Sequence, residues 1–135
     1  MSDLEVLKEI EKIIGKELKP CPDNINIMDW GAKNCYLLND YQQIIGLNLR
    51  NNQLSDISVL KELKKLIQLN LSDNKLNEIS ALKELKNLTQ LDLSNNQISN
   101  KTRFGRMILK HIQYLSWTPH QNLIPKNSTL KYHDI

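Results

Sequence analysis

Residues of the types used in catalysis and metal binding occur in this 135-residue chain, but their spacing suits neither role. The three histidines, His111, His120 and His133, lie nine and thirteen residues apart near the C-terminus. A metal site built from them would need unusual folding. The motifs HExxH and CxxC are absent, and so is a glycine-rich phosphate loop. We therefore expect a chain that is not an enzyme and that binds no metal or cofactor.

Acidic pairs such as Asp56 with Glu62, and Glu78 with Glu84, recur at equal spacing, which indicates solvated flanks of a repeat. Catalytic carboxylates would require a pocket.

The chain is 40% hydrophobic, with 18 basic and 15 acidic residues and a net charge of +3. This composition excludes a disordered chain, and the sequence has no apolar run of about 18 residues that could span a membrane.

A repeat of 22 residues organises the middle of the chain. Residues 44–65 and 66–87 are identical at 13 of 22 positions, and a third copy begins at residues 88–99. Each copy fits the pattern LxxLxLxxNxL, with Ile accepted for Leu. The matching residues are Ile44, Leu47, Leu49, Asn52 and Leu54; Leu66, Leu69, Leu71, Asn74 and Leu76; and Leu88, Leu91, Leu93, Asn96 and Ile98.

Each copy predicts a short strand followed by a turn. The LxL step has the period of a strand and places two Leu side chains on one face. The Asn that follows can bond the backbone groups that the turn leaves unpaired. We therefore expect Asn52, Asn74 and Asn96 to form a ladder inside the stacked coils.

The second half of each copy predicts a short helical return. Either Ser55 or Asp56 can begin the first return, and either Asn77 or Glu78 can begin the second. Apolar residues then recur at every third position, which favours a 3₁₀ or short α turn with one buried edge. They are Ile57, Leu60 and Leu63 in the first copy and Ile79, Leu82 and Leu85 in the second.

The N-terminal residues predict a helix that covers the first coil, because the end of a solenoid needs a lid. Ser2 or Asp3 can cap its start, and Gly15 weakens its end. Residues 35–49 then predict a hairpin with Asn39 and Asp40 in the turn. The helical spacing is carried by Leu4, Leu7, Ile10, Ile14 and Leu18.

The repeats resemble those of the leucine-rich repeat family, and especially the 22-residue subclass of bacterial internalin-like proteins. The resemblance covers residues 44–99. It implies an α/β fold: a short right-handed solenoid with a parallel sheet on its concave face, an N-terminal capping helix and an irregular C-terminal cap. It also implies protein binding. We expect one domain, 1–135, with an N-terminal cap at 1–43, three repeats at 44–109, and a C-terminal cap and tail at 110–135.

Trp30, followed by Cys35 and the run IIGLNL, loosely resembles the N-terminal cap of plant-type leucine-rich repeats, in which a disulfide is usual. By that resemblance, Cys21 and Cys35 could pair in an oxidising compartment. The alternative is two buried thiols. It is favoured because MSDLEVLKEIEKIIGKEL mixes charged and apolar residues and is no secretory signal. For the same reason we expect a cytoplasmic protein, unlike the secreted internalins.

The repeat pattern degenerates beyond Ile98, and two interpretations remain open. One is a helical return near 103–110 followed by a strand near 111–116. The other is one continuous helix through 103–116, because the apolar residues also fit that period. After Pro119 we expect a tail without regular structure.

Side chains that alternate with the inward Leu residues are expected to face the concave side of the sheet. We predict that they bind an unidentified partner protein, together with the adjoining caps, and that the chain is a monomer without this partner. Neither a membrane nor a nucleic acid is expected as the main partner. The predicted binding residues are Asn48, Arg50, Gln68, Asn70, Ser72, Gln90, Asp92 and Ser94.

The charge distribution supports an alternative function. Residues 1–100 hold 12 basic and 14 acidic residues, whereas residues 101–135 hold 6 basic residues and 1 acidic residue. The segment 101–131 could therefore bind a nucleic acid or an acidic partner. In a helix, Arg103, Arg106 and Lys110 would lie on one side.

Overall fold

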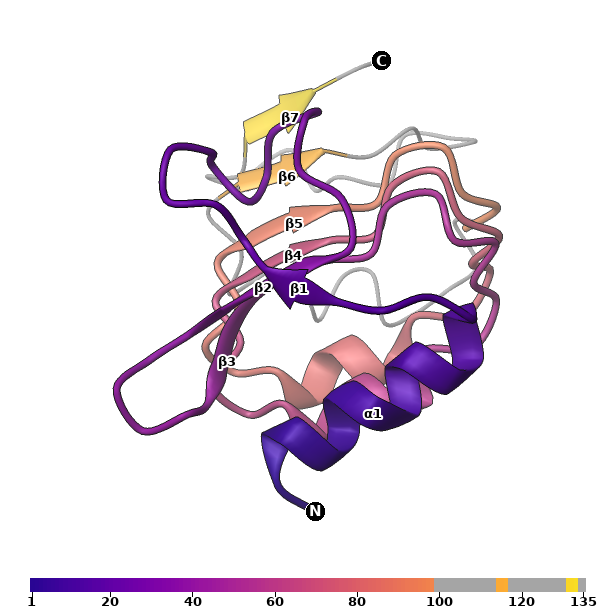
Figure 1. Ribbon diagram of the computed structural model, residues 1–135. Coiled ribbons are helices and arrows are strands. Elements are labelled where there is room, and N and C mark those ends of the chain that lie inside the picture. Colours follow the sequence, from indigo (N-terminus) through magenta and orange to yellow (C-terminus); the bar gives the residue numbers. More distant parts are fainter. Residues whose placement is uncertain (99–113, 117–130, 134–135) are drawn as a thin grey trace.

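The computed structural model describes residues 1–98, 114–116 and 131–133. Within these residues, one sheet runs in the order β1-β2-β3-β4-β5-β6-β7 (Figure 1). β2 and β3 are antiparallel, and the other neighbouring strands are parallel. The strands are β1 (Lys19–Pro20), β2 (Cys35–Leu38), β3 (Ile44–Asn48), β4 (Gln68–Asn70), β5 (Gln90–Asp92), β6 (Tyr114–Ser116) and β7 (Lys131–His133).

The three repeat copies form the consecutive parallel strands β3, β4 and β5. Their register advances by one repeat per strand, so that Leu47, Leu69 and Leu91 are aligned. All three side chains are fully buried. The 22-residue period therefore predicted both the strands and their inward face, and the chain folds as a solenoid.

Two 3₁₀ helices, η1 (Ser58–Glu62) and η2 (Ser80–Glu84), return the chain on the side opposite the sheet. Of the residues considered for their starts, Asp56 and Glu78 make the bonds. Asp56 accepts from the N–H of Ser58 at 2.9 Å, and Glu78 accepts from the N–H of Ser80 at 2.8 Å. The bond from Ser58 lowers the pKa of Asp56.

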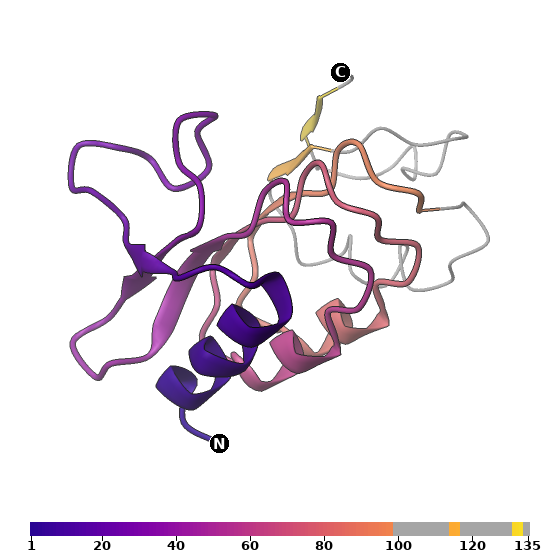
Figure 2. The same ribbon diagram turned by 45° about the vertical axis from the view of Figure 1, so that its right-hand side comes forward.

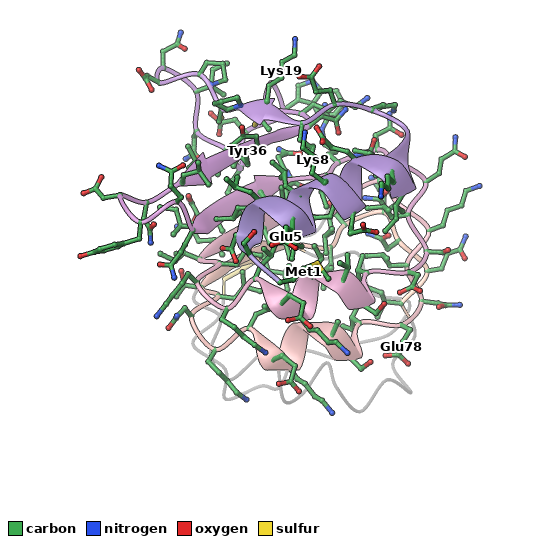
Figure 3. The ribbon with its side chains drawn as sticks, turned by 60° about the horizontal axis from the view of Figure 1, so that its bottom comes forward. Met1, Glu5, Lys8, Lys19, Tyr36 and Glu78 are labelled. Carbon is green, nitrogen blue, oxygen red and sulfur yellow. The ribbon has the colours of Figure 1, made fainter. Side chains whose placement is uncertain are left out.

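The helix α1 (Asp3–Ile14) packs against η1 and covers the first coil, as expected. Figure 3 shows α1, marked by Glu5 and Lys8, with the 3₁₀ helices below it in the view. Ser2 and Glu5 form a reciprocal capping box, and Gly15 ends the helix with a φ of 69°. Leu4 was expected on the inner side but is 43% exposed. The buried face consists of Val6, Leu7 and Ile10.

The hairpin predicted over 35–49 is confirmed by β2 and β3. In its turn, the Asn39 side chain accepts from the N–H groups of Tyr41 and Gln43, at 2.9 and 3.0 Å. The connection between β1 and β2 is a long loop on the side of the sheet away from α1 and the 3₁₀ helices (Figure 2). We refer to residues 21–34 as the cap loop.

The C-terminal strands decide one open alternative and correct one expectation. Tyr114–Ser116 pair in parallel with β5, which agrees with the strand expected near 111–116 and not with a helix that continues through residue 116. Lys131–His133 pair with β6, so the tail contains regular structure that its sequence did not suggest. Residues 103–113, which include Arg103, Arg106 and Lys110, lie outside the described residues.

In the part of the chain that the structure describes, none of the helices has the length and apolar character needed to cross a membrane.

Candidate functional site

The Asn of each repeat joins its coil to the coil before it. The side-chain oxygen of Asn74 accepts from the N–H groups of Asn52 and Leu54, at 3.0 and 2.9 Å. Its amide nitrogen donates to the carbonyls of Leu49 and Leu71, both at 3.0 Å. Asn74 therefore supplies hydrogen-bond partners to backbone atoms at the turns of two coils, which buried backbone groups require.

The ladder extends in both directions from Asn74. Asn96 accepts from the N–H of Leu76 at 2.9 Å and donates to the carbonyl of Leu71 at 2.9 Å. Asn52 donates to the side chain of Asn34 at 2.7 Å. The cap loop thus replaces the missing coil at the N-terminal end of the ladder.

A second repeated position ends the strands. Asn48, Asn70 and Asp92 are aligned in the sheet. Each side-chain oxygen accepts from the backbone N–H two residues later, at 3.0, 3.0 and 2.9 Å respectively. Sequence reasoning treated these residues as binding residues. Their recurrence at one repeat position, two residues before a turn, is the signal for this structural role.

The cap loop covers the first strand of the predicted binding face. Asn48 donates to the carbonyls of Ile27 and Ala32, at 2.8 and 3.0 Å. A Cβ added at Gly46 would lie 3.0 Å from Leu37 Cδ1 and 3.1 Å from Ile27 Cδ1. The close contact explains the glycine, and β3 presents no open surface at these positions.

Facing the concave side does not by itself expose a side chain to solvent in this sheet. Four of the eight predicted binding residues are buried, because their polar groups bond to the cap loop or to the turn that follows each strand. They are Asn48, Asn70, Ser72 and Ser94.

Gln68, Gln90 and Asp92 remain partly exposed on β4 and β5. Gln68 Nε2 donates to Gln90 Oε1 at 2.8 Å, which links the two strands on this face. Asp92 Oδ1 accepts from both the N–H and the hydroxyl of Ser94. We call these three residues the open concave face. The next strand continues it in register, with Tyr114 beside Gln90.

Arg50 lies at the edge of this face and holds the cap loop. Its guanidinium carbon is 4.0 Å from the ring centroid of Trp30, and its Nη2 donates to the Trp30 carbonyl at 3.0 Å. Arg50 Nη1 is 3.8 Å from Asp73 Oδ2. The Arg50 side chain is only 13% exposed, whereas Trp30 is 76% exposed. The arrangement fixes an aromatic side chain that faces solvent.

Cys21 and Cys35 are free, buried thiols inside the cap loop region. They belong to a small apolar cluster with Ile27 and Ala32, separate from the main core. Burial, followed by a hydrogen bond with Cys21, raises the pKa of Cys35 to about 12. The thiol is therefore protonated at neutral pH and packs as an apolar group.

Among residues 1–98 and the two C-terminal strands, no three His, Cys, Asp or Glu residues are grouped as metal ligands. Arg103, Arg106 and Lys110 stay a prediction, because they lie outside the described residues.

Comparisons with known proteins agree with this architecture. A family model for leucine-rich repeats, in two copies, matches residues 42–84 and 64–106. Among solved structures, the chain is similar to an internalin (inlF) from Listeria monocytogenes, with a TM-score of 0.52 and 21% identity. The match covers 77% of this chain but only 40% of that chain, so the likeness concerns the fold. None of the curated proteins matches this chain.

Proposed function

We propose that this chain, a leucine-rich repeat protein with an internalin-like fold, is a non-catalytic module that binds a partner protein. The binding surface is the open concave face, Gln68, Gln90 and Asp92, together with Trp30 at its edge. The observation that carries the proposal is the combination of partly exposed polar side chains on β4 and β5 with an exposed aromatic residue that Arg50 holds at the end of β3. Binding energy in protein interfaces is concentrated in such aromatic anchors.

The rigidity of the face supports this role. The Asn ladder joins the turns of adjacent coils, and the Gln68–Gln90 bond joins their strands. A preorganised surface loses little conformational freedom on binding. Three strands span only about 10 Å across the sheet, whereas a standard interface takes about 800 Å² from each partner. We therefore propose that the cap loop contributes to the interface, because Arg50 joins its Trp30 to the end of β3.

A cytoplasmic location is part of the proposal, and the free thiols Cys21 and Cys35 support it because thiols persist in reducing compartments. We also propose that the chain is a monomer without its partner.

Affinity capture from the source cells tests the proposal, because the proteins that are retained should change when the open concave face is altered. The bait proteins are the wild type, the double variant Gln68→Arg/Gln90→Arg and the control Asn77→Arg, which places the same side chain at an exposed site outside the sheet. We expect one set of proteins to be retained by the wild type and the control but lost with the double variant. Capture that is equal with all three baits would contradict binding through this face.

The charge of residues 101–135, six basic residues against one acidic residue, favours nucleic-acid or acidic-partner binding as a second candidate function. When a basic protein binds a nucleic acid, it displaces cations that were condensed on the phosphates. Added salt opposes this release, so the affinity falls steeply as the salt concentration rises. Affinity for a DNA duplex that is insensitive to salt, or unchanged in Arg103→Glu/Arg106→Glu, would exclude it.

A further inference from the structure

We propose that Trp30 and Asp92 receive a basic segment of the partner protein, in which a Lys or Arg side chain contacts the Trp30 ring and the charge of the segment meets Asp92. The inference rests on the proposed function, because it names the chemistry of the partner that uses the open concave face.

Trp30 is a preorganised aromatic surface. Arg50 occupies one side of the ring at 4.0 Å from the centroid and bonds the Trp30 carbonyl, yet the residue remains 76% exposed. A freely rotating tryptophan would lose conformational entropy when a partner binds it. The Trp30 ring is already held by the Arg50 side chain, which is 13% exposed, so less entropy is lost on binding. The exposed ring surface can accept the aliphatic stem of Lys or Arg, since both carry long apolar stems below their charges.

The carboxylate of Asp92 favours a cation as the occupant of this face. Arg50 is already matched by Asp73, whose Oδ2 lies 3.8 Å from its guanidinium. Asp92 is partly exposed, and no basic side chain of the described residues pairs with it. The hydrogen bonds from Ser94 both reach Oδ1. Its Oδ2 is therefore the carboxylate oxygen left for an incoming cation, and a carboxylate is stabilised by a charged hydrogen-bond donor.

Arg50, which holds Trp30, and Asp92 belong to the two strands that flank β4. Arg50 follows β3, and Asp92 ends β5. Neighbouring strands lie about 4.8 Å apart, so β3 and β5 are separated by about 10 Å. An extended segment of three or four residues spans that distance. A segment with basic residues at alternate positions can therefore reach from Asp92 to the strand whose Arg50 is bonded to Trp30.

The repeat supplies a mild variant for the test. The positions equivalent to Asp92 in the two preceding coils are Asn48 and Asn70, which make the same bond to the backbone two residues later. The substitution Asp92→Asn therefore removes the charge and keeps the turn. Glu78→Gln is the matched control, because it neutralises an exposed acid on the returning side of the coil.

Fluorescence anisotropy with a fluorescein-labelled (Arg-Gly)₃ peptide as the probe measures the interaction, with (Glu-Gly)₃ as the acidic counterpart. We expect the full chain to bind the basic probe and not the acidic one. Trp30→Ala should weaken binding about tenfold, and Asp92→Asn should weaken it about two- to fivefold. Glu78→Gln should leave it unchanged. Circular dichroism of each variant checks that the fold is kept.

Equal binding of the two probes, or binding of the basic probe that survives both Trp30→Ala and Asp92→Asn, would overturn the inference. The result is separable from that of the proposed function. If Gln68→Arg/Gln90→Arg abolishes protein capture while the probes show no charge preference, the binding face stands and the basic-segment inference fails. If capture ignores the face but the probe depends on Trp30 and Asp92, the proposed function fails instead.

Discussion

The side-chain oxygen of Asn74 accepts a hydrogen bond from the backbone N–H of Leu54, at 2.9 Å, although the two residues lie on successive coils. Asn74 also donates to the carbonyl of Leu49 in that earlier coil. One side chain thus joins two successive turns, beside the backbone bond from the Lys75 N–H to the Leu54 carbonyl at 2.8 Å. The stacking of coils depends on this residue as well as on buried Leu.

The variant Asn74→Ala should lower the free energy of unfolding by about 2–4 kcal/mol, because several buried backbone groups would lose their partners. Asn74 is 7% exposed, so water replaces these bonds poorly. The control Asn77→Ala, at an exposed position, should change stability by less than about 0.5 kcal/mol. Urea unfolding of both variants measures the difference. Equal stabilities would mean that the ladder contributes little.

Leu71→Ala should cost about 2–5 kcal/mol, since Leu71 is fully buried in the middle coil and its truncation leaves a cavity. Leu4→Ala, at a residue 43% exposed, should cost much less. A loss below about 1 kcal/mol for Leu71→Ala, measured by thermal and urea unfolding, would be inconsistent with the packing described for the core.

The regular part of the fold was predictable because its periods are local. The spacing of Leu47, Leu69 and Leu91 indicated aligned strands. The three-residue spacing of Leu60 and Leu63 indicated a 3₁₀ or short α return, and the structure has a 3₁₀ helix there. The helical spacing of Leu7 and Ile10 indicated α1. Each of these features repeats within one turn, one strand or one coil, so the sequence displays it directly.

The binding face was only partly predictable, because its exposure depends on the irregular cap loop. Strand alternation correctly separated Leu69 from Gln68 and Asn70, but it could not show that Asn48 is covered by the carbonyls of Ile27 and Ala32. The stacking of Arg50 on Trp30 joins residues twenty positions apart through a loop without periodicity. Patterns of local spacing contain no information about such a contact.

Gly46→Val tests the packing of the cap loop on β3. A side chain at this position would press on Leu37 and Ile27, so the variant should lose about 1–3 kcal/mol of stability. Gly31→Val is a matched control, since nothing lies within 4 Å of a Cβ at Gly31. Urea unfolding should separate the two variants. If Gly31→Val is as destabilising as Gly46→Val, the close contact at Gly46 is not the cause.

The Cys35 thiol should make stability depend on pH in the alkaline range. Burial and then the contact with Cys21 raise the pKa of Cys35 from 9.0 to about 12, so the folded chain holds this proton more tightly than the unfolded chain. The resulting stabilisation is fully present below pH 9 and is lost as the pH rises towards 12. Wild-type stability should therefore fall more steeply over that range than the stability of Cys35→Ala. Parallel pH profiles of urea unfolding for the two proteins would contradict this.

Photo-cross-linking in the source cells tests the central claim, that a partner protein binds the open concave face, most directly. A photoreactive phenylalanine analogue is placed at Gln90, on the face, and separately at Asn77, outside the sheet. We predict a discrete cross-linked protein from position 90 that is absent from position 77 and is lost when Trp30→Ala is added. Cross-links of equal yield and identity from both positions, or none from position 90, would contradict the account.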